Sequence, residues 1–293
     1  MSMDGTGSNT LVRTMERGGE MVRELLGRKG PVIPAIRLYG SIAAGQRPNR
    51  INIETVNPLL EQAFRIKSAP AIAIVINSPG GSAVQSRLVS KRIRELADEH
   101  EKEVLVFVED VAASGGYFIA VAGDEIYADP SSIVGSIGVI MATFGFEEAI
   151  KKLGISRRLY TAGKNKSTLD PFLPEKKEDV ERIKTFELDI HKVFIEWVKT
   201  HRGARLTASD DELFTGEFWT AARGLDMGLI DGIGDVYEVI RNRFGDDARL
   251  KWIRKRKSIF SMPGLGFGSA TSGLASDVAA ELEDRALWSR FGL

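Results

Sequence analysis

The chain has no cysteine and only three histidines among its 293 residues. Without cysteine it cannot form disulfides, thiolate metal sites or a cysteine nucleophile. The histidines at 100, 191 and 201 lie far apart, without acidic residues at metal-ligand spacing, so we predict no bound metal. Walker-type spacing of glycine and lysine is also missing, and we predict no nucleotide or other cofactor.

Charge and hydropathy exclude further classes of protein. The 40 Lys and Arg residues balance the 40 Asp and Glu residues, so no overall charge attracts the chain to nucleic acid. Apolar residues make up 43% of the chain and charged residues 27%, which is typical of a globular protein. The most apolar later stretch, 133–146, is too short and too rich in glycine to span a membrane as a helix.

Both end segments differ from the middle of the chain. Residues 1–30 lack the apolar core of a secretory signal and predict a short amphipathic helix, either frayed or in contact with a membrane surface. Residues 251–293 contain a basic cluster at 251–257, a Gly- and Ser-rich linker and a terminal helix near 276–291. We interpret the basic cluster as a solvated strand or linker edge rather than a nucleic-acid or lipid site. The predicted location is cytoplasmic, with peripheral membrane contact left open.

Between these ends, residues 31–250 are predicted to form the main domain. Strands are predicted at 32–38, 71–76, 104–108, 125–127, 134–141 and 158–161, and helices at 56–67, 82–99, 174–201, 218–228 and 236–244. Ser82 and Gln85 match a capping box at the start of one helix. The alternation of strands and helices predicts right-handed βαβ units on a largely parallel sheet, which is an α/β fold.

Two glycine-rich turns follow two of the apolar strands, NSPGGS at 77–82 and AASGGY at 112–117. In a parallel sheet both turns lie at the carboxyl ends of strands, where such sheets place their sites. Each turn leads into a helix, whose first backbone N–H groups can stabilise negative charge. Ser114 is either an exposed nucleophile or the N-cap of its helix, and the local pattern leaves both interpretations open.

A serine nucleophile needs a base, and the histidines are poor candidates. His100 ends a charged helix, while His191 and His201 lie in the long helix at 174–201, so we interpret all three as structural or solvated. A lysine can replace histidine when burial lowers its pKa enough for the amine to lose its proton near neutral pH.

Five motifs carry a resemblance to a known family: INSPGGS at 76–82, VAASGGYFIA at 111–120, IVGSIGVI at 133–140, TAGKNK at 161–166 and GLIDGIGD at 228–235. In these motifs the chain resembles the signal peptide peptidase A (SppA, or protease IV) family, particularly its SohB-like members with a single repeat. The resemblance covers roughly residues 32–245. It implies a ClpP/crotonase-like fold with stacked βαβ units, here with a C-terminal helical extension, and a serine peptidase that uses a Ser–Lys dyad.

The resemblance also implies roles for particular residues: Ser114 as nucleophile, Lys166 as general base, Ser136 as the hydroxyl that orients the lysine amine, and Gly81 and Gly115 as oxyanion donors through their N–H groups. Lys164 lies in the same loop and is a rival for the base. Apolar side chains at 137, 139 and 140 are expected to exclude water from the amine. Activity is then expected to rise with pH through the lowered lysine pKa.

The implied substrates are short, unstructured, apolar peptides, such as remnant signal peptides. General peptide clearance in the cytoplasm fits as well, because no N-terminal membrane anchor is apparent in the sequence. The resemblance further implies a ring- or dome-like homo-oligomer, in which adjacent protomers supply the serine and the lysine of one site.

Two other functions remain open from the sequence. A crotonase-like acyl-CoA enzyme would use the same turns as an oxyanion hole, with Glu109 and Asp110 as candidate acid and base. A catalytically inactive ring scaffold at the membrane surface would keep the fold without hydrolysis. The combination of Ser114, Ser136 and Lys166 favours the peptidase over both.

Overall fold

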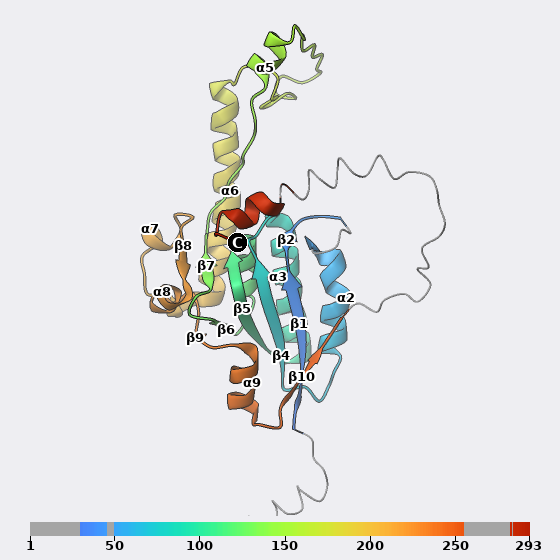
Figure 1. Cartoon of the computed structure of the whole chain (residues 1–293), viewed down its shortest axis with the longest axis vertical. Helices are drawn as coiled ribbons and strands as arrows, with labels where there is room; N and C mark the ends of the chain where they lie inside the picture. The colour runs from blue at the N-terminus through green and yellow to red at the C-terminus, as the bar shows by residue number, and fades with distance from the viewer. Residues whose placement is uncertain (1–29, 46–49, 255–281, 283) are drawn as a thin grey trace, which may run out of the picture.

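The computed structural model describes residues 30–45, 50–254, 282 and 284–293, and its centre is an eight-stranded sheet (Figure 1). The strands run in the order β10-β1-β4-β5-β6-β9, with β7 beside β5 and β8 beside β7. Their bounds are β1 Val32–Tyr39, β4 Ala71–Ser78, β5 Glu103–Ala113, β6 Glu125–Ala128, β7 Ile133–Gly135, β8 Phe218–Thr220, β9 Gly232–Ile233 and β10 Arg249–Trp252. Every described pairing in this sheet is parallel except that of β7 with β8. A short separate ribbon pairs β2 Ser41–Ile42 with β3 Arg50–Ile51.

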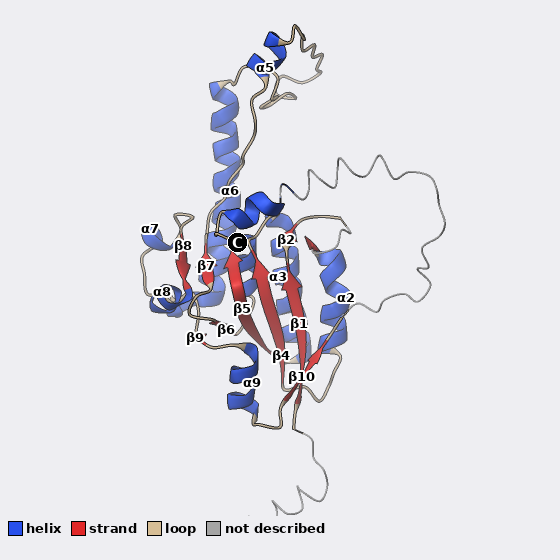
Figure 2. Cartoon of the chain, in the orientation of Figure 1, coloured by secondary structure: helices blue, strands red, loops and turns tan. Residues whose placement is uncertain are grey.

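Helices cover both faces of the central strands (Figure 2). The helices are α2 Ile53–Phe64, α3 Ala83–His100, α4 Gly115–Ala120, α5 Glu147–Lys152, α6 Lys177–Arg202, α7 Asp210–Leu213, α8 Ala221–Asp226 and α9 Val236–Phe244, with a 3-10 turn, η1, at Gly203–Arg205. Strand β4 is buried at every position because its isoleucines pack toward α2 and α3 while its alternate residues pack toward α9. This arrangement confirms the predicted α/β, ClpP/crotonase-like fold with stacked βαβ units.

A long projection, which we call the arm (residues 142–185), stands away from the sheet and carries α5 near its far end (Figure 1). Helix α5 buries no residue. Of the four buried residues in α6, three lie in its last nine positions, so the buried contacts of that helix with the body lie mostly at its end. Phe144, Leu153, Ile155 and Tyr160 are exposed on the arm.

Three predicted elements differ in the structure. The strand predicted at 134–141 ends at Gly135, because Ser136 has a φ of 53° that an extended strand cannot continue. Residues 158–161 are exposed coil, since no neighbouring strand lies beside them to pair with. The helix predicted at 218–228 begins only at Ala221, because the three preceding residues form β8 against β7.

The capping box predicted at Ser82 is half present. The Ser82 Oγ accepts from the Gln85 N–H at 3.4 Å. The Gln85 Oε1 instead accepts from the Ile53 N–H at 3.1 Å, so this side chain joins the starts of α2 and α3.

The end segments are described only in part. The N-terminal segment predicted at 1–30 lies outside the described residues except for its last position, as does most of 255–283. The basic cluster begins inside β10, where Lys251 and Trp252 pair with β1, as the strand-edge interpretation expects. Residues 284–289 of the predicted terminal helix are helical. In the part of the chain that the structure describes, no helix combines the length and apolar character needed to cross a bilayer.

Candidate active site

Ser114 lies in a strained turn between β5 and α4. Its backbone has φ 52° and ψ −120°, a conformation that residues other than glycine rarely adopt. The Ser114 N–H donates to the Gly135 carbonyl at 2.9 Å, which ties the turn to β7. The serine occupies the N-cap position of α4, but its side chain makes no capping hydrogen bond. The structure therefore favours the nucleophile interpretation over the N-cap interpretation.

Glycines allow the two sequence turns to pack directly on each other. A Cβ on Gly80 would lie 2.8 Å from the Ser114 Cβ, and one on Gly116 would lie 2.5 Å from the Ser78 carbonyl oxygen. Gly80 also has a φ of 103°, which favours glycine on conformational grounds. The turns at 77–82 and 112–117 thus form one structure around Ser114.

Two backbone amides beside Ser114 are free to bind an anion. Gly81 and Gly115 both line the same cavity, and a Cβ on Gly115 would lie 3.4 Å from the Gly81 nitrogen. Ile42 bonds to the residues on either side of Gly81, so the Gly81 N–H itself faces away from β2. Gly115 is the first residue of α4, where an amide has no acceptor within the helix. Neither N–H donates to another described residue, as an oxyanion hole requires.

Gly80→Ala should lower kcat by about 100-fold, because the added Cβ displaces the nucleophile by a fraction of an ångström to about 1 Å. The control is Gly45→Ala, since Gly45 has a similar φ of 96° but no atom within 4 Å of the added Cβ. Both variants place an alanine at a similar positive φ, but only in Gly80→Ala does the added Cβ contact Ser114. Steady-state peptide hydrolysis and thermal unfolding measure the two effects; equal activity in both variants would show that the close approach does not matter.

Ser136 lies beside Ser114 at the end of the next strand. The register pairs Ala113 with Gly135, so the two serines follow at equivalent positions of β5 and β7. Ser136 also has a positive φ of 53°, and its N–H donates to the Glu217 carbonyl at 2.6 Å. It is 5% exposed. Two neighbouring parallel strands therefore end in matching strained serines.

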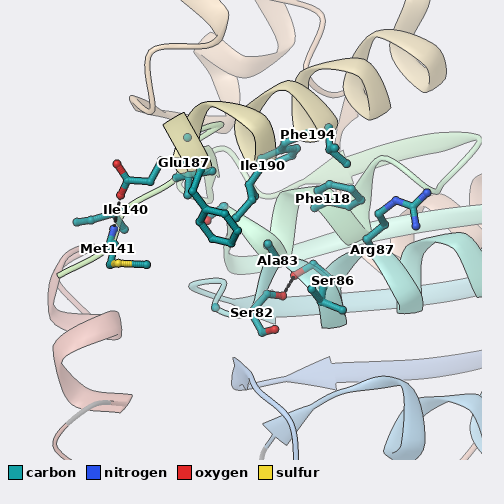
Figure 3. A pocket seen from close by; sticks show the side chains of 18 of the residues that line it. Ser82, Ala83, Ser86, Arg87, Phe118, Ile140, Met141, Glu187, Ile190 and Phe194 are labelled. Atoms are coloured by element: carbon teal, nitrogen blue, oxygen red, sulfur yellow. Dashed lines mark hydrogen bonds between the residues drawn. The ribbon is translucent and has the colours of Figure 1, made fainter. Parts of the chain in front are cut away.

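A cavity of about 630 Å³ opens beside Ser114 (Figure 3). The starts of α3 and α4 form one side, and segment 138–141 with α6 forms the other. Its apolar lining residues are Val84, Phe118, Val139, Ile140, Met141, Phe186, Ile190, Val193 and Phe194. Several remain exposed to solvent, with Ile140 at 67% and Phe186 at 53%. A contiguous exposed apolar surface of this kind is typical of a binding site.

Helix α6 holds segment 138–141 in place through two side chains. The His191 Nε2 bonds to the Ile137 carbonyl at 2.9 Å. One turn earlier, the Glu187 Oε1 accepts from the Met141 N–H at 2.8 Å (Figure 3). The prediction that His191 is structural is confirmed, but sequence reasoning missed that it supports the cavity wall. The available signal was the spacing of four residues between Glu187 and His191, which places both side chains on one face of the helix.

The structure does not bring Lys166 to Ser114 within the chain. Lys166 and Lys164 are both exposed on the arm, and neither lines the cavity. The loop that carries them lies in the arm, toward its far end (Figure 1). Of the predicted site residues, Ser114, Ser136, Gly81 and Gly115 lie together, and the lysine stands apart.

The two carboxylates considered for acyl-CoA chemistry do not face the cavity. Glu109 pairs with Arg37 at 2.8 Å, and burial raises the pKa of its carboxyl. Asp110 accepts from the Asn77 Nδ2 at 2.5 Å. Neither side chain lines the cavity beside Ser114. Among the described residues, no cluster of three potential metal ligands occurs either.

The motif at 228–235 supplies carbonyl and carboxylate acceptors to a buried polar network that contacts α4. The Arg202 guanidinium donates to the Gly228 carbonyl and, at 2.7 Å, to the Asp231 carboxylate. The Tyr117 hydroxyl on α4 donates to the Leu229 carbonyl at 2.7 Å, and burial raises the pKa of this tyrosine. The network joins α6, α4 and the chain before β9.

The fold and the site define this chain as an α/β protein. The strained turn at Ser114, which we call the serine elbow, lies beside two free backbone amides and an apolar groove, which is the cavity described above. The family model for peptidase family S49 matches residues 97–249, slightly more than half of the chain. The chain therefore belongs to peptidase family S49, and the predicted SppA- and SohB-like family is confirmed.

Relatives of this chain are longer proteins. It is 52% identical over 273 residues to a Brucella melitensis protein named Na(+)/H(+) antiporter NhaA, covering 89% of this chain and 37% of that protein. It is 30% identical over 214 residues to the chloroplastic serine protease SPPA of Arabidopsis thaliana, covering 71% and 31%. The chain thus spans about a third of the length of these relatives. Among solved structures, a mutant of the 1510-N membrane-bound stomatin-specific protease matches with a TM-score of 0.49 and 15% identity, covering 78% of this chain and 99% of that one.

The antiporter name belongs to the whole Brucella protein. The match covers 89% of the present chain and so includes the region that matches family S49. A match to 37% of that protein gives no ground for assigning ion exchange to this chain.

Proposed function

We propose that this chain is a serine endopeptidase in which Ser114 attacks the carbonyl of a bound peptide. The observation that carries the proposal is the geometry of Ser114. This residue has a strained backbone, its hydroxyl makes no helix-capping hydrogen bond, and it lies beside two free backbone amides at the wall of an apolar cavity. Backbone strain of this kind persists where the surrounding structure maintains it, and it commonly occurs at active sites. Membership of peptidase family S49 supports the same reaction.

In the proposed mechanism the Ser114 Oγ forms a bond to the peptide carbonyl carbon, and its proton passes to the neutral amine of Lys166. The Gly81 and Gly115 N–H groups receive the oxyanion, and one such donor contributes about 3–4 kcal/mol to transition-state stabilisation. The lysine then returns the proton to the leaving amine. Water hydrolyses the acyl-enzyme in a second step, with the lysine again as base.

The base is proposed to come from a second copy of the chain. A lysine base works only when its amine is uncharged, which requires an environment with little water. Lys166 is exposed on an arm whose apolar side chains are also exposed, including Phe144 and Tyr160. Docking of the arm on a neighbouring copy would bury these side chains and bring Lys166 toward the neighbour's Ser114 and Ser136. A ring- or dome-like homo-oligomer repeats this contact around a closed symmetry.

The proposed substrates are short, unstructured, apolar peptides. The groove presents mostly apolar side chains, against which a peptide without secondary structure can bury its own apolar side chains. Remnant signal peptides fit this chemistry, as do other loose apolar peptides cleared in the cytoplasm. A closed assembly would exclude folded proteins from the sites.

Covalent capture tests the proposed nucleophile. A fluorophosphonate probe, applied to the intact assembly, should label one residue, and peptide mapping should find the label on Ser114. An acyl-CoA enzyme or an inactive scaffold would leave Ser114 unlabelled. Labelling that maps only to another serine would equally refute the assignment.

Mixing inactive variants tests the proposed sharing of sites. Ser114→Ala and Lys166→Ala should each be inactive alone, while a co-assembled equal mixture should regain activity in about a quarter of its sites, since random neighbours combine freely in a symmetric ring. Lys164→Ala is the matched control and should stay active by itself. Verified mixed assemblies without any recovery would mean that each site is built within one chain. Loss of activity in Lys164→Ala, with Lys166→Ala active, would move the base to Lys164.

We also propose that the chain works in the cytoplasm close to a membrane. Support comes from the Brucella relative, in which the matching segment belongs to a protein named Na(+)/H(+) antiporter NhaA. Cell fractionation should recover part of the full chain with membranes, and salt or carbonate washing should release it. Recovery solely in the soluble fraction would contradict the peripheral association.

A further inference from the structure

We propose that the C-terminal segment 284–293 is a positioning element of the active site, in which Phe291 supports the strand ends that carry Ser114 and Ser136. This inference rests on the proposed peptidase function. It assigns to the end of the chain a part in catalysis without any contact with the substrate.

Phe291 packs behind the serine elbow. Its side chain is buried in a cluster with Val111 and Ala113, the last part of β5, and Ala113 directly precedes Ser114. The alternate residue Ala112 belongs to the main core cluster on the other face of the sheet. Phe291 therefore contacts the face of β5 opposite to the one that packs toward α3 and α4.

The Phe291 ring also supports the turn at Ser136. Phe291 meets Phe218 of β8 in an edge-on contact, with ring centroids 5.1 Å apart. Phe218 pairs with Gly135, whose carbonyl accepts the Ser114 N–H, and the neighbouring Glu217 carbonyl accepts the Ser136 N–H. One aromatic side chain thus contacts β5, which ends just before Ser114, and β8, which pairs with the strand that ends just before Ser136.

Three further contacts hold the segment in this position. The Ser41 Oγ donates to the Asp284 carboxylate at 2.5 Å. The Trp288 ring stacks on Tyr39 with centroids 5.7 Å apart. The Phe291 N–H donates to the Trp288 carbonyl at 2.9 Å and so turns Phe291 back toward the sheet. Figure 1 shows this terminal helix, in red, across the carboxyl ends of the central strands.

The contacts point to support rather than to inhibition. Neither Trp288 nor Phe291 lines the cavity beside Ser114, so the segment leaves the groove open. A non-glycine residue with positive φ costs free energy and stays in place only when its surroundings hold it. Phe291 fills the space behind the small side chain of Ala113, and without it the turn can relax toward an ordinary conformation.

The test compares Phe291→Ala with Leu293→Ala in the full chain. Leu293 is 51% exposed in the same segment and serves as the control. In Phe291→Ala, kcat and the rate of fluorophosphonate labelling at Ser114 should both fall by about 100-fold, because a small displacement of a nucleophile has an effect of this size. KM should stay within about 2-fold, since the groove is untouched. Phe291→Leu should recover most of the labelling rate.

Each outcome distinguishes this inference from the proposed function. All rates are measured on assembled protein, well below the unfolding temperature of each variant, and Phe291→Val, which also removes the ring, replaces Phe291→Ala if that variant does not fold. Labelling of Ser114 at the same rate in the parent chain and in folded Phe291→Ala or Phe291→Val would overturn the positioning role and leave the peptidase proposal intact. Failure of the parent chain itself to label at Ser114 would overturn both.

Discussion

Ser114→Ala should reduce kcat/KM for peptide hydrolysis by at least about 10⁴-fold, because covalent catalysis ends while the amides of Gly81 and Gly115 keep only a residual effect. The free energy of unfolding should change by no more than about 0.5 kcal/mol, since the hydroxyl makes no capping bond. Hydrolysis of an apolar peptide and a denaturant titration measure the two quantities.

The control for this prediction is Ser131→Ala. Ser131 is exposed in the loop before β7 and does not line the cavity, so its replacement should leave hydrolysis unchanged. If Ser114→Ala retained more than about a tenth of the parent rate, Ser114 would not be the nucleophile. Ser136, which is strained in the same way on the next strand, would then be the first residue to test.

Asp231→Ala should lower the free energy of unfolding by about 3–5 kcal/mol, the largest stability effect expected for a single polar side chain of this protein. The side chain of Arg202 is 1% exposed, and that of Asp231 is 17% exposed. The Asp231 carboxylate also accepts from the Ile126 N–H at 2.7 Å. Removing it leaves a buried guanidinium without a counterion and a backbone amide without an acceptor.

An exposed ion pair on the same part of the molecule supplies the matched control. The Arg223–Glu212 pair has a contact of 3.5 Å, with both side chains well exposed. Glu212→Ala should therefore cost no more than about 1 kcal/mol. Thermal unfolding of both variants should show a fall of about 10 °C for Asp231→Ala and little change for Glu212→Ala. Equal shifts would mean that burial of Arg202 does not determine the strength of this network.

Local pattern was enough to predict most of the core elements. The continuous apolar run of β4 and the regular apolar spacing of α3 and α6 reflect burial that each segment shows by itself. The glycine-rich turns likewise indicated where free amides would lie. The strand predicted at 158–161 failed because its residues have strand-like composition but no partner strand, and pairing is a long-range property.

The candidate site was predictable only in part. The pattern around Ser114 left nucleophile and N-cap equally open; the missing side-chain cap bond speaks against the N-cap, and the nucleophile role stays a prediction. Glu187 and His191 read as ordinary residues of an amphipathic helix until the structure placed them against segment 138–141. Phe291 gave no signal at all, because its partners on the sheet lie more than seventy residues away in sequence.

By itself, the sequence determined the α/β class, the order of the central strands and the longer helices, and the residues of the two glycine turns, since periodicity and turn chemistry act over a few neighbouring positions. The tertiary structure decided which turns pack together, that Ser114 and Ser136 follow the ends of adjacent strands, and that Lys166 stands apart from them within the chain. Those facts depend on strand pairing and on the path of the arm, which join residues distant in the chain and leave no local trace in its composition.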